Sequence, residues 1–208
     1  MDRRHTEASP LVLGLTGPIG CGKTTVGDIL LEMGALERID ADQIVHDLMA
    51  RDRELIPRVA DAFGQEVLNA DGSVNRPALG RIVFGDPEKL RRLEAITHPA
   101  VRRVVRERLH AHAGRRGLVI VDAVKLLQSD LLPLMDAVWV VRCPRGEEMR
   151  RLTKTRGMTR EDAGARIRAQ PSFDHPSVTR VVNNNASLME LRENVSGGWA
   201  ELTRELTE

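Results

Sequence analysis

The chain has 208 residues, of which 41% are hydrophobic and 29% charged, a balance typical of a soluble globular protein. This length suits one α/β domain with room for an inserted subdomain. A net charge of +1 and the scarcity of aromatic residues (two Trp, three Phe, no Tyr) argue against a nucleic-acid partner. No hydrophobic run approaches the roughly 18 residues that a membrane span needs, so we expect no membrane partner.

The N-terminal segment and the cysteines bear on the cellular compartment. Residues 1–10, MDRRHTEASP, lack the hydrophobic stretch of a signal peptide, and we interpret them as a short disordered tail. Cys21 and Cys143 are the only cysteines, and they imply neither a disulfide framework nor a zinc site. We therefore expect a cytoplasmic protein in a reducing environment, and we expect it to be a monomer or a weak homo-oligomer.

The stretch 11–25, LVLGLTGPIGCGKTT, carries the clearest functional signal. Its first residues have the hydrophobic pattern of a buried strand. Residues 17–24 then match G-x-x-x-x-G-K-[ST] at every fixed position, and a helix is predicted at 25–33. Glycines let successive N–H groups face inward around a phosphate, and the N-terminus of the helix points at the same phosphates. This strand–loop–helix order favours nucleotide binding over a glycine-rich turn without a ligand.

Within this loop, phosphate and metal ligands can be assigned. The nucleotide-binding residues are Gly17, Pro18, Ile19, Gly20, Cys21, Gly22, Lys23, Thr24 and Thr25. Lys23 is expected to reach the β- and γ-phosphates, and the Thr24 hydroxyl is expected to ligate Mg²⁺. The sequence therefore predicts a protein that binds a nucleoside triphosphate with Mg²⁺.

Two acidic residues, Asp40 and Asp42, follow a short strand predicted at 36–39. Ligands of open α/β sheets gather at the carboxyl ends of strands, so both carboxylates are candidates for a site. Alternation along an extended chain puts both on the same side. A helix predicted at 43–49 leaves an alternative for each of them, which is to cap the N-terminus of that helix.

Residues 51–112 predict helices and no convincing strand. Asn75-Arg76-Pro77 begins one helix with proline at its first position, and Asp86-Pro87 begins another. Pro99 should interrupt that second helix. A helical stretch of about sixty residues is far longer than an ordinary crossover, so we expect an inserted subdomain that holds a second substrate.

The third predicted strand, 118–121, ends at Asp122. An acid at this position usually helps to hold Mg²⁺ directly or through water, and a helix cap is the alternative. The fourth strand, predicted at 137–141, leads into a basic helical segment at 145–156. This segment suits a lid that closes on phosphates, although a solvated basic surface would have the same composition.

The remaining elements complete an α/β pattern. Thr159 is predicted to cap a helix that ends near residue 170, and a fifth strand (178–182) and a terminal helix (188–202) follow. Strands that alternate with helices around a phosphate loop predict a P-loop NTPase-type fold, a three-layer αβα arrangement with a five-stranded parallel sheet. A small-molecule kinase fits the length, the insertion and the basic lid, and no Asn-Lys-x-Asp signature of a GTPase is present.

The chain is expected to divide as follows: a tail at 1–10, a core at 11–42, 116–143 and 176–208, a helical acceptor-binding insertion at 43–115, and a lid at 144–175.

From about residue 12 to residue 199, a series of motifs resembles the dephospho-coenzyme A kinase family. They are GLTGPIGCGKTT at 14–25, Ile39-Asp40-Ala41-Asp42, the turn at 68–73 with Arg76, Val83-Phe84 with Asp86-Pro87, 93–99 with His98-Pro99, 165–170 and Val182-Asn183-Asn184. The resemblance implies transfer of the γ-phosphoryl group of ATP to the ribose 3′-hydroxyl of dephospho-CoA, with Mg²⁺, in the last step of coenzyme A synthesis. It also implies a five-stranded parallel core, a helical acceptor-binding domain and a lid.

The resemblance also implies roles for individual residues. Asp42 matches the catalytic aspartate position of the family, and it would orient the acceptor hydroxyl and take its proton. Lys23 and Arg156 would neutralise charge during the transfer, and Thr24 and Asp122 would hold the metal. The remaining contacts would come from Asn184 to the nucleotide and from Arg76 and His98 to the acceptor. Lys125 is a further candidate for acceptor binding, because its segment borders the acceptor pocket in the family.

Two segments depart from the family pattern. Where the family usually has Asp-x-Pro-Leu-Leu-Phe-Glu after the third strand, this chain has Asp122-Ala-Val-Lys125-Leu-Leu-Gln128. Before the lid helix the family tends to carry Arg-Asp-Gly, and here Thr155-Arg156-Gly157 leaves either Lys154 or Arg156 as the lid cation. The alternatives to this kinase are a kinase of another small nucleoside or nucleotide, and a nucleotide-binding regulator that has lost the transfer.

Overall fold

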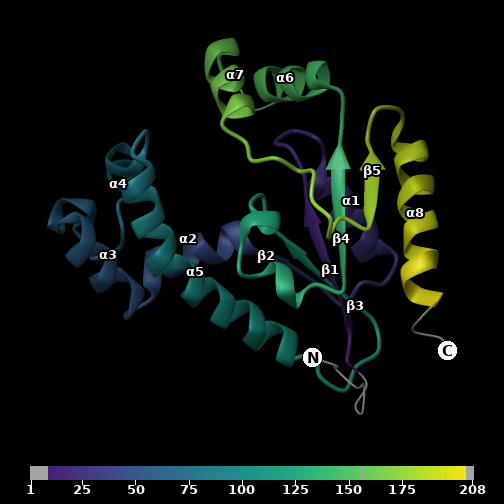
Figure 1. The fold of residues 1–208 in the computed structure, drawn as a ribbon, viewed down its shortest axis with the longest axis horizontal. Coiled ribbons are helices and arrows are strands. Elements are labelled where there is room, and N and C mark those ends of the chain that lie inside the picture. The colour runs from purple at the N-terminus through teal and green to yellow at the C-terminus, as the bar shows by residue number, and fades with distance from the viewer. Residues whose placement is uncertain (1–8, 156, 205–208) are drawn as a thin grey trace. The chain divides into compact units, whose positions relative to one another are not determined.

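The computed structural model describes residues 9–155 and 157–204 (Figure 1). The chain divides into two compact units. Unit 1 comprises Met1–Ile39 and Leu109–Glu208, and unit 2 comprises Asp40–Arg108. Among the described residues, no helix combines the length and hydrophobicity needed to cross a membrane.

Unit 1 is built on a five-stranded parallel sheet in the order β2-β3-β1-β4-β5. Its strands are β1 (Leu11–Thr16), β2 (Glu37–Asp40), β3 (Leu118–Asp122), β4 (Ala137–Arg142) and β5 (Arg180–Asn183). The three central strands β3, β1 and β4 are almost entirely buried, which explains why they are nearly continuous hydrophobic runs. The α/β class, the parallel sheet and all five predicted strands are confirmed, with ends displaced by at most two residues.

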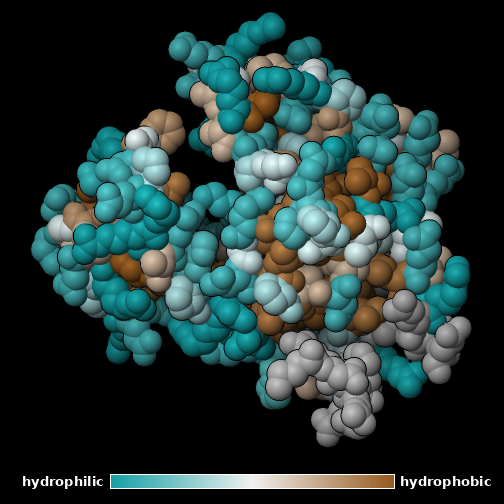
Figure 2. All heavy atoms as spheres, in the orientation of Figure 1, coloured by the Kyte–Doolittle hydropathy of each residue, from teal (hydrophilic) through white to brown (hydrophobic). Residues whose placement is uncertain are grey.

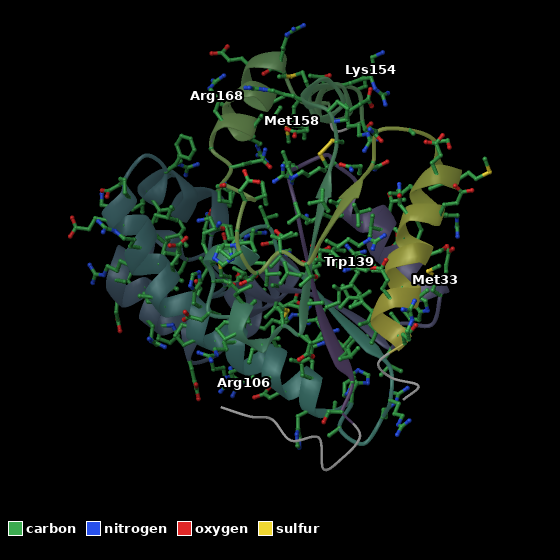
Figure 3. All side chains as sticks on the ribbon, turned by 45° about the vertical axis from the view of Figure 1, so that its right-hand side comes forward. Met33, Arg106, Trp139, Lys154, Met158 and Arg168 are labelled. Carbon is green, nitrogen blue, oxygen red and sulfur yellow. A yellow bond between two sulfur atoms is a disulfide. The ribbon has the colours of Figure 1, made fainter. Side chains whose placement is uncertain are left out.

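Two helices, α1 (Lys23–Glu32) and α8 (Leu188–Arg204), form a hydrophobic core with one face of the sheet. The centre of this core is Trp139 of β4, labelled in Figure 3, which is 1% exposed. Gly198 of α8 packs directly on Trp139, because a Cβ atom there would come within 2.5 Å of the indole ring. On the opposite face, the short turns η2 (Leu126–Gln128) and η3 (Leu132–Leu134) bury hydrophobic side chains.

Helices α6 (Arg145–Lys154) and α7 (Arg160–Arg168) follow β4 and pack on each other. Figure 1 shows them beyond the carboxyl ends of β1 and β4, and Figure 2 shows that mainly hydrophilic residues cover them. The predicted cap at Thr159 is confirmed, because its hydroxyl oxygen accepts a hydrogen bond from the Asp162 N–H at 3.0 Å.

Unit 2 is helical, as predicted. Its helices are α2 (Ala41–Arg51), α3 (Leu55–Phe63), the short turn η1 (Gln65–Val67), α4 (Arg76–Val83) and α5 (Pro87–His110), whose last two residues belong to unit 1. An isolated antiparallel bridge joins Leu68 to Val74. Asn75 caps α4 through a hydrogen bond from the Ala78 N–H at 3.0 Å. Pro77 therefore takes the second position of the helix, one residue later than predicted.

The expected break at Pro99 is wrong. Helix α5 continues through this residue without interruption. Proline removes one intrahelical hydrogen bond and usually kinks or breaks a helix. Here Thr97 and Val101, on either side of Pro99, are each 5% exposed, and we attribute the continuous helix to this burial.

Candidate nucleotide-binding site

Three glycines in the loop between β1 and α1 have a positive φ, and two of them are the fixed glycines of the motif. Gly17 has a φ of 142° and Gly22 a φ of 94°. A Cβ atom would lie 2.2 Å from the Val141 carbonyl oxygen at the first position and 2.3 Å from the Asn184 amide nitrogen at the second. Both fixed glycines of the motif are therefore required by backbone geometry and by close packing against neighbouring elements.

Two side chains from other elements hold the loop by its carbonyl groups. The Arg151 guanidinium of α6 donates to the Gly20 carbonyl at 3.1 Å. The amide of Asn184, a buried residue directly after β5, donates to the Cys21 carbonyl at 2.8 Å. Asn184, predicted to contact the nucleotide, thus lies against the loop. Arg151 belongs to the basic segment predicted as a lid, although no individual role was predicted for it.

The loop N–H groups are partly engaged within the protein. The Ile19 N–H donates to the side-chain oxygen of Gln170, and the Cys21 N–H donates to the Pro18 carbonyl at 3.2 Å. Gln170 lies just after α7, in a motif that the sequence singled out without giving this residue a role. Its carboxamide oxygen accepts from an N–H group of the loop that could instead donate to a phosphate oxygen.

Asp122, at the end of β3, is a buried anion between two cations. Its carboxylate lies 3.6 Å from the Lys23 ammonium and accepts a hydrogen bond from the Arg38 guanidinium at 2.8 Å. Arg38 also contacts Asp28 of α1, at 3.1 Å, and so ties β2 to both α1 and β3. Because the Asp122 carboxylate engages these cations and caps no helix, the helix-cap alternative for Asp122 is wrong.

The donors around Lys23 suit a hard divalent cation. Thr24 presents an exposed hydroxyl in the first turn of α1, and Asp122 presents carboxylate oxygens at the end of β3. Hydroxyl, carboxylate and phosphate oxygens are the ligands that Mg²⁺ prefers. These residues therefore fit the predicted metal.

The remaining predicted residues of unit 1 are Lys125, which follows β3, and the two candidates for a lid cation, Lys154 and Arg156. Lys125 is exposed and directly precedes η2. Gln128, which replaces the usual glutamate, donates to the Ser172 carbonyl at 2.9 Å. Lys154 is exposed at the end of α6 (Figure 3), whereas Arg156 lies outside the described residues.

In unit 2, the structure separates the roles of the two aspartates. The Asp40 side chain accepts a hydrogen bond from the Gln43 N–H at 2.9 Å and so caps α2. Asp42 is exposed in the first turn of the same helix, so the N-cap alternative is confirmed for Asp40 and wrong for Asp42. Of the predicted acceptor residues, Arg76 is exposed at the first position of α4, and His98 is partly buried in α5.

The expectation that the cysteines imply no disulfide is wrong. Cys21 and Cys143 are joined by a disulfide, with their Cα atoms 5.1 Å apart. Thr16 is paired with Val140 in the parallel ladder of β1 and β4, so the segments that follow these strands leave the sheet side by side. This adjacency brings together residues separated by 122 positions, and neither the number nor the spacing of the cysteines reveals it.

Arg38 leads to a prediction about stability. Replacing Arg38 with Met keeps most of the side-chain volume but leaves the buried Asp122 without its nearest cation. We expect the free energy of unfolding, measured by urea denaturation, to fall by about 2–4 kcal/mol. The matched control is Arg103→Met, which removes a more exposed ion pair with Asp52 and should cost less than about 1 kcal/mol. Equal losses in the two variants would contradict the importance of Arg38.

Comparison with known proteins places the chain in a family. The model of the dephospho-CoA kinase family matches residues 11–190. A dephospho-CoA kinase from Streptomyces avermitilis is 42% identical over 194 residues, which cover 92% of this chain and 94% of the relative.

Solved structures agree with this placement. The crystal structure of TT1252 from Thermus thermophilus is 32% identical, with a TM-score of 0.77, and the match covers 94% of this chain and 99% of that one. A dephospho-CoA kinase from Campylobacter jejuni shares the fold at 23% identity and a TM-score of 0.60, over 92% of this chain and 97% of its own. On the family match and the 42% identity together, the chain belongs to the dephospho-CoA kinase family.

Proposed function

We propose that this protein transfers the γ-phosphoryl group of ATP to the ribose 3′-hydroxyl of dephospho-CoA, giving coenzyme A and ADP in the cytoplasm. Membership of the family supports the reaction. The observation that carries the proposal is the phosphate loop, in which Gly17 and Gly22 fix the backbone and Lys23 lies beside the acid at the end of β3.

The proposed chemistry depends on positioning and charge neutralisation, because the transition state of phosphoryl transfer is loose and carries charge on its peripheral oxygens. Lys23 exchanges its contact with Asp122 for the β- and γ-phosphates of ATP. Arg151, held at the Gly20 carbonyl, is placed to approach the same phosphates from α6. Arg156 and Lys154 remain candidates for a further lid cation.

Thr24 and Asp122 would hold Mg²⁺, which when bound neutralises phosphate charge. Because Asp122 already contacts Lys23 and Arg38, we propose that its carboxylate would hold the metal indirectly, through a water molecule between them. Asn184 keeps the loop in place by holding the Cys21 carbonyl.

On the acceptor side, we propose that Asp42 orients the ribose hydroxyl and accepts its proton. Asp42 follows the end of β2 by two residues and is exposed. Arg76, His98 and Lys125 are proposed to bind the acceptor.

A product assay tests the proposed reaction. Purified protein with Mg²⁺ and ATP should convert dephospho-CoA to coenzyme A with an equal amount of ADP, as measured by liquid chromatography and mass spectrometry. Adenosine and simple nucleotides serve as comparison acceptors. Faster turnover of one of these would indicate a different kinase, and ATP binding without any product would indicate a regulator.

The metal role of Thr24 has its own test. Thr24→Ala removes the hydroxyl ligand, so we expect the Mg²⁺ concentration that gives half-maximal turnover to rise about tenfold, with partial rescue at high Mg²⁺. Thr24→Ser keeps the hydroxyl and should behave like the parent protein. A Thr24→Ala variant with an unchanged Mg²⁺ dependence would exclude this role.

A further inference from the structure

The disulfide between Cys21 and Cys143 joins the phosphate loop to a segment outside it. It is the yellow bond below α6 and α7 in Figure 3. Cys21 occupies the fifth of the eight motif positions and is fully buried, whereas Cys143, just after β4, is partly exposed. One sulfur therefore belongs to the phosphate loop, and the other belongs to a neighbouring segment and is partly exposed.

A third group faces this pair. One carboxylate oxygen of Glu148 in α6 lies 3.7 Å from the Cys21 sulfur, and its other oxygen has no hydrogen-bond partner. Glu148 is only 7% exposed, and burial raises the pKa of its carboxyl group, although Arg145 and Gln170 oppose this effect. A buried carboxylate oxygen without a partner, next to a sulfur atom that carries no proton in the disulfide form, suggests a function in the dithiol form.

We propose that Cys21 and Cys143 are a reversible dithiol–disulfide pair that controls the nucleotide affinity of the phosphate loop, with Glu148 as the proton acceptor for Cys21. Intracellular disulfides are usually transient and often serve redox sensing, so the pair is compatible with a cytoplasmic enzyme. This inference rests on the nucleotide binding proposed above, but not on the identity of the acceptor.

The oxidant is a low-molecular-weight disulfide, RSSR, and the exchange balances in two steps. The more accessible Cys143 loses its proton to solvent and attacks RSSR, which forms a mixed disulfide and releases RS⁻. Cys21 then passes its proton to Glu148 and attacks the Cys143 sulfur, which releases the second RS⁻. Glu148 then releases its proton to solvent, so the protein loses two electrons and two protons. RSSR becomes two RSH once the released thiolates are protonated.

The disulfide should weaken ATP binding because it fixes the loop in the arrangement seen here. In this arrangement the Cys21 N–H donates to the Pro18 carbonyl, and the Cys21 carbonyl is held by Asn184. Phosphate binding in such a loop needs the N–H groups to face the ligand. A covalent bond from Cys21 to the end of β4 limits the rotation that would release this N–H group.

The test measures redox state and ATP binding separately. Protein is equilibrated at a series of ratios of reduced to oxidised glutathione, and intact mass and peptide mapping follow the bond between Cys21 and Cys143. ATP affinity is measured by calorimetry without acceptor, because dephospho-CoA is itself a thiol. A chelator is present, because the ligand atoms of Cys21, Cys143 and Glu148 lie within 4.8 Å of one another and two thiols here could bind zinc.

We expect the oxidised protein to bind ATP at least about tenfold more weakly than the reduced protein, with full recovery in dithiothreitol. Cys143 lies outside the phosphate loop, so Cys143→Ser should bind ATP as tightly as the reduced protein does, at every ratio of reduced to oxidised glutathione. Glu148→Gln should form the same disulfide about tenfold more slowly, as expected when a proton acceptor is removed.

Failure to form the bond in oxidised glutathione, or an oxidised protein with unchanged or tighter ATP binding, would overturn the proposal. An unchanged rate in Glu148→Gln would overturn the role of Glu148. A reduced protein that does not bind ATP would overturn both this inference and the proposed function. Redox-dependent ATP binding without formation of coenzyme A would overturn the proposed function alone.

Discussion

Lys23→Ala should reduce turnover by about 10³-fold or more, because the variant lacks the cation proposed to neutralise charge on the β- and γ-phosphates. In the structure the Lys23 ammonium lies 3.6 Å from Asp122, and only 15% of its side chain is exposed. ATP binding should weaken as well, since phosphate contacts form before the transition state. Steady-state kinetics with varied ATP, together with calorimetry, would separate the loss in kcat from the loss in affinity.

A loss of stability should not be the cause of the lower turnover in Lys23→Ala. Asp122 keeps its hydrogen bond from Arg38 when Lys23 is replaced, so the buried carboxylate is not left without a cation. The matched control is Lys89→Ala, which removes an exposed lysine paired with Asp86 in unit 2 and should leave turnover unchanged. Near-normal turnover in Lys23→Ala would show that the loop is structural only.

The sequence predicted the sheet and the phosphate loop because both depend on local patterns. Buried parallel strands are hydrophobic runs, and the loop motif fixes glycine where the backbone has a positive φ at Gly22. The cap at Thr159 was predictable for the same reason, since a cap forms its hydrogen bond within three residues. The local rule that proline interrupts a helix gave a wrong prediction at Pro99. There the helix is continuous, and residues on both sides of the proline are buried.

Contacts between distant segments were not predictable from one sequence. Arg38 lies on a short strand with a mixed burial pattern, and only the placement of β2 next to β3 brings it to Asp122. Arg151 of α6 and Gln170, just after α7, reach the phosphate loop from positions more than a hundred residues away in the chain. The disulfide depends in the same way on the order of β1 and β4 in the sheet. These contacts therefore depend on the order of the strands and the placement of the helices, which the sequence motifs do not determine.

The identity of the proton acceptor can be tested on a single helix. Asp40 caps α2 through the Gln43 N–H, whereas Asp42 lies in the first turn without a capping role. Removing the charge of Asp42 should therefore change stability only through the helix dipole, by less than about 1 kcal/mol. Asp47→Asn is the matched control, because Asp47 is an exposed carboxylate on the same helix that accepts a hydrogen bond from the Gln43 side chain.

Asp42→Asn should lower turnover by about 10²-fold or more while ATP affinity stays within twofold of the parent value, because an amide cannot accept the proton of the ribose hydroxyl. Coenzyme A formation at saturating substrates would measure the first effect, and calorimetry with ATP alone the second. Asp40→Asn retains an acceptor for the Gln43 N–H, so it should keep both the helix cap and most of the activity. Full turnover in Asp42→Asn together with loss of turnover in Asp40→Asn would assign proton transfer to Asp40, and the cap would then be the secondary role of that carboxylate.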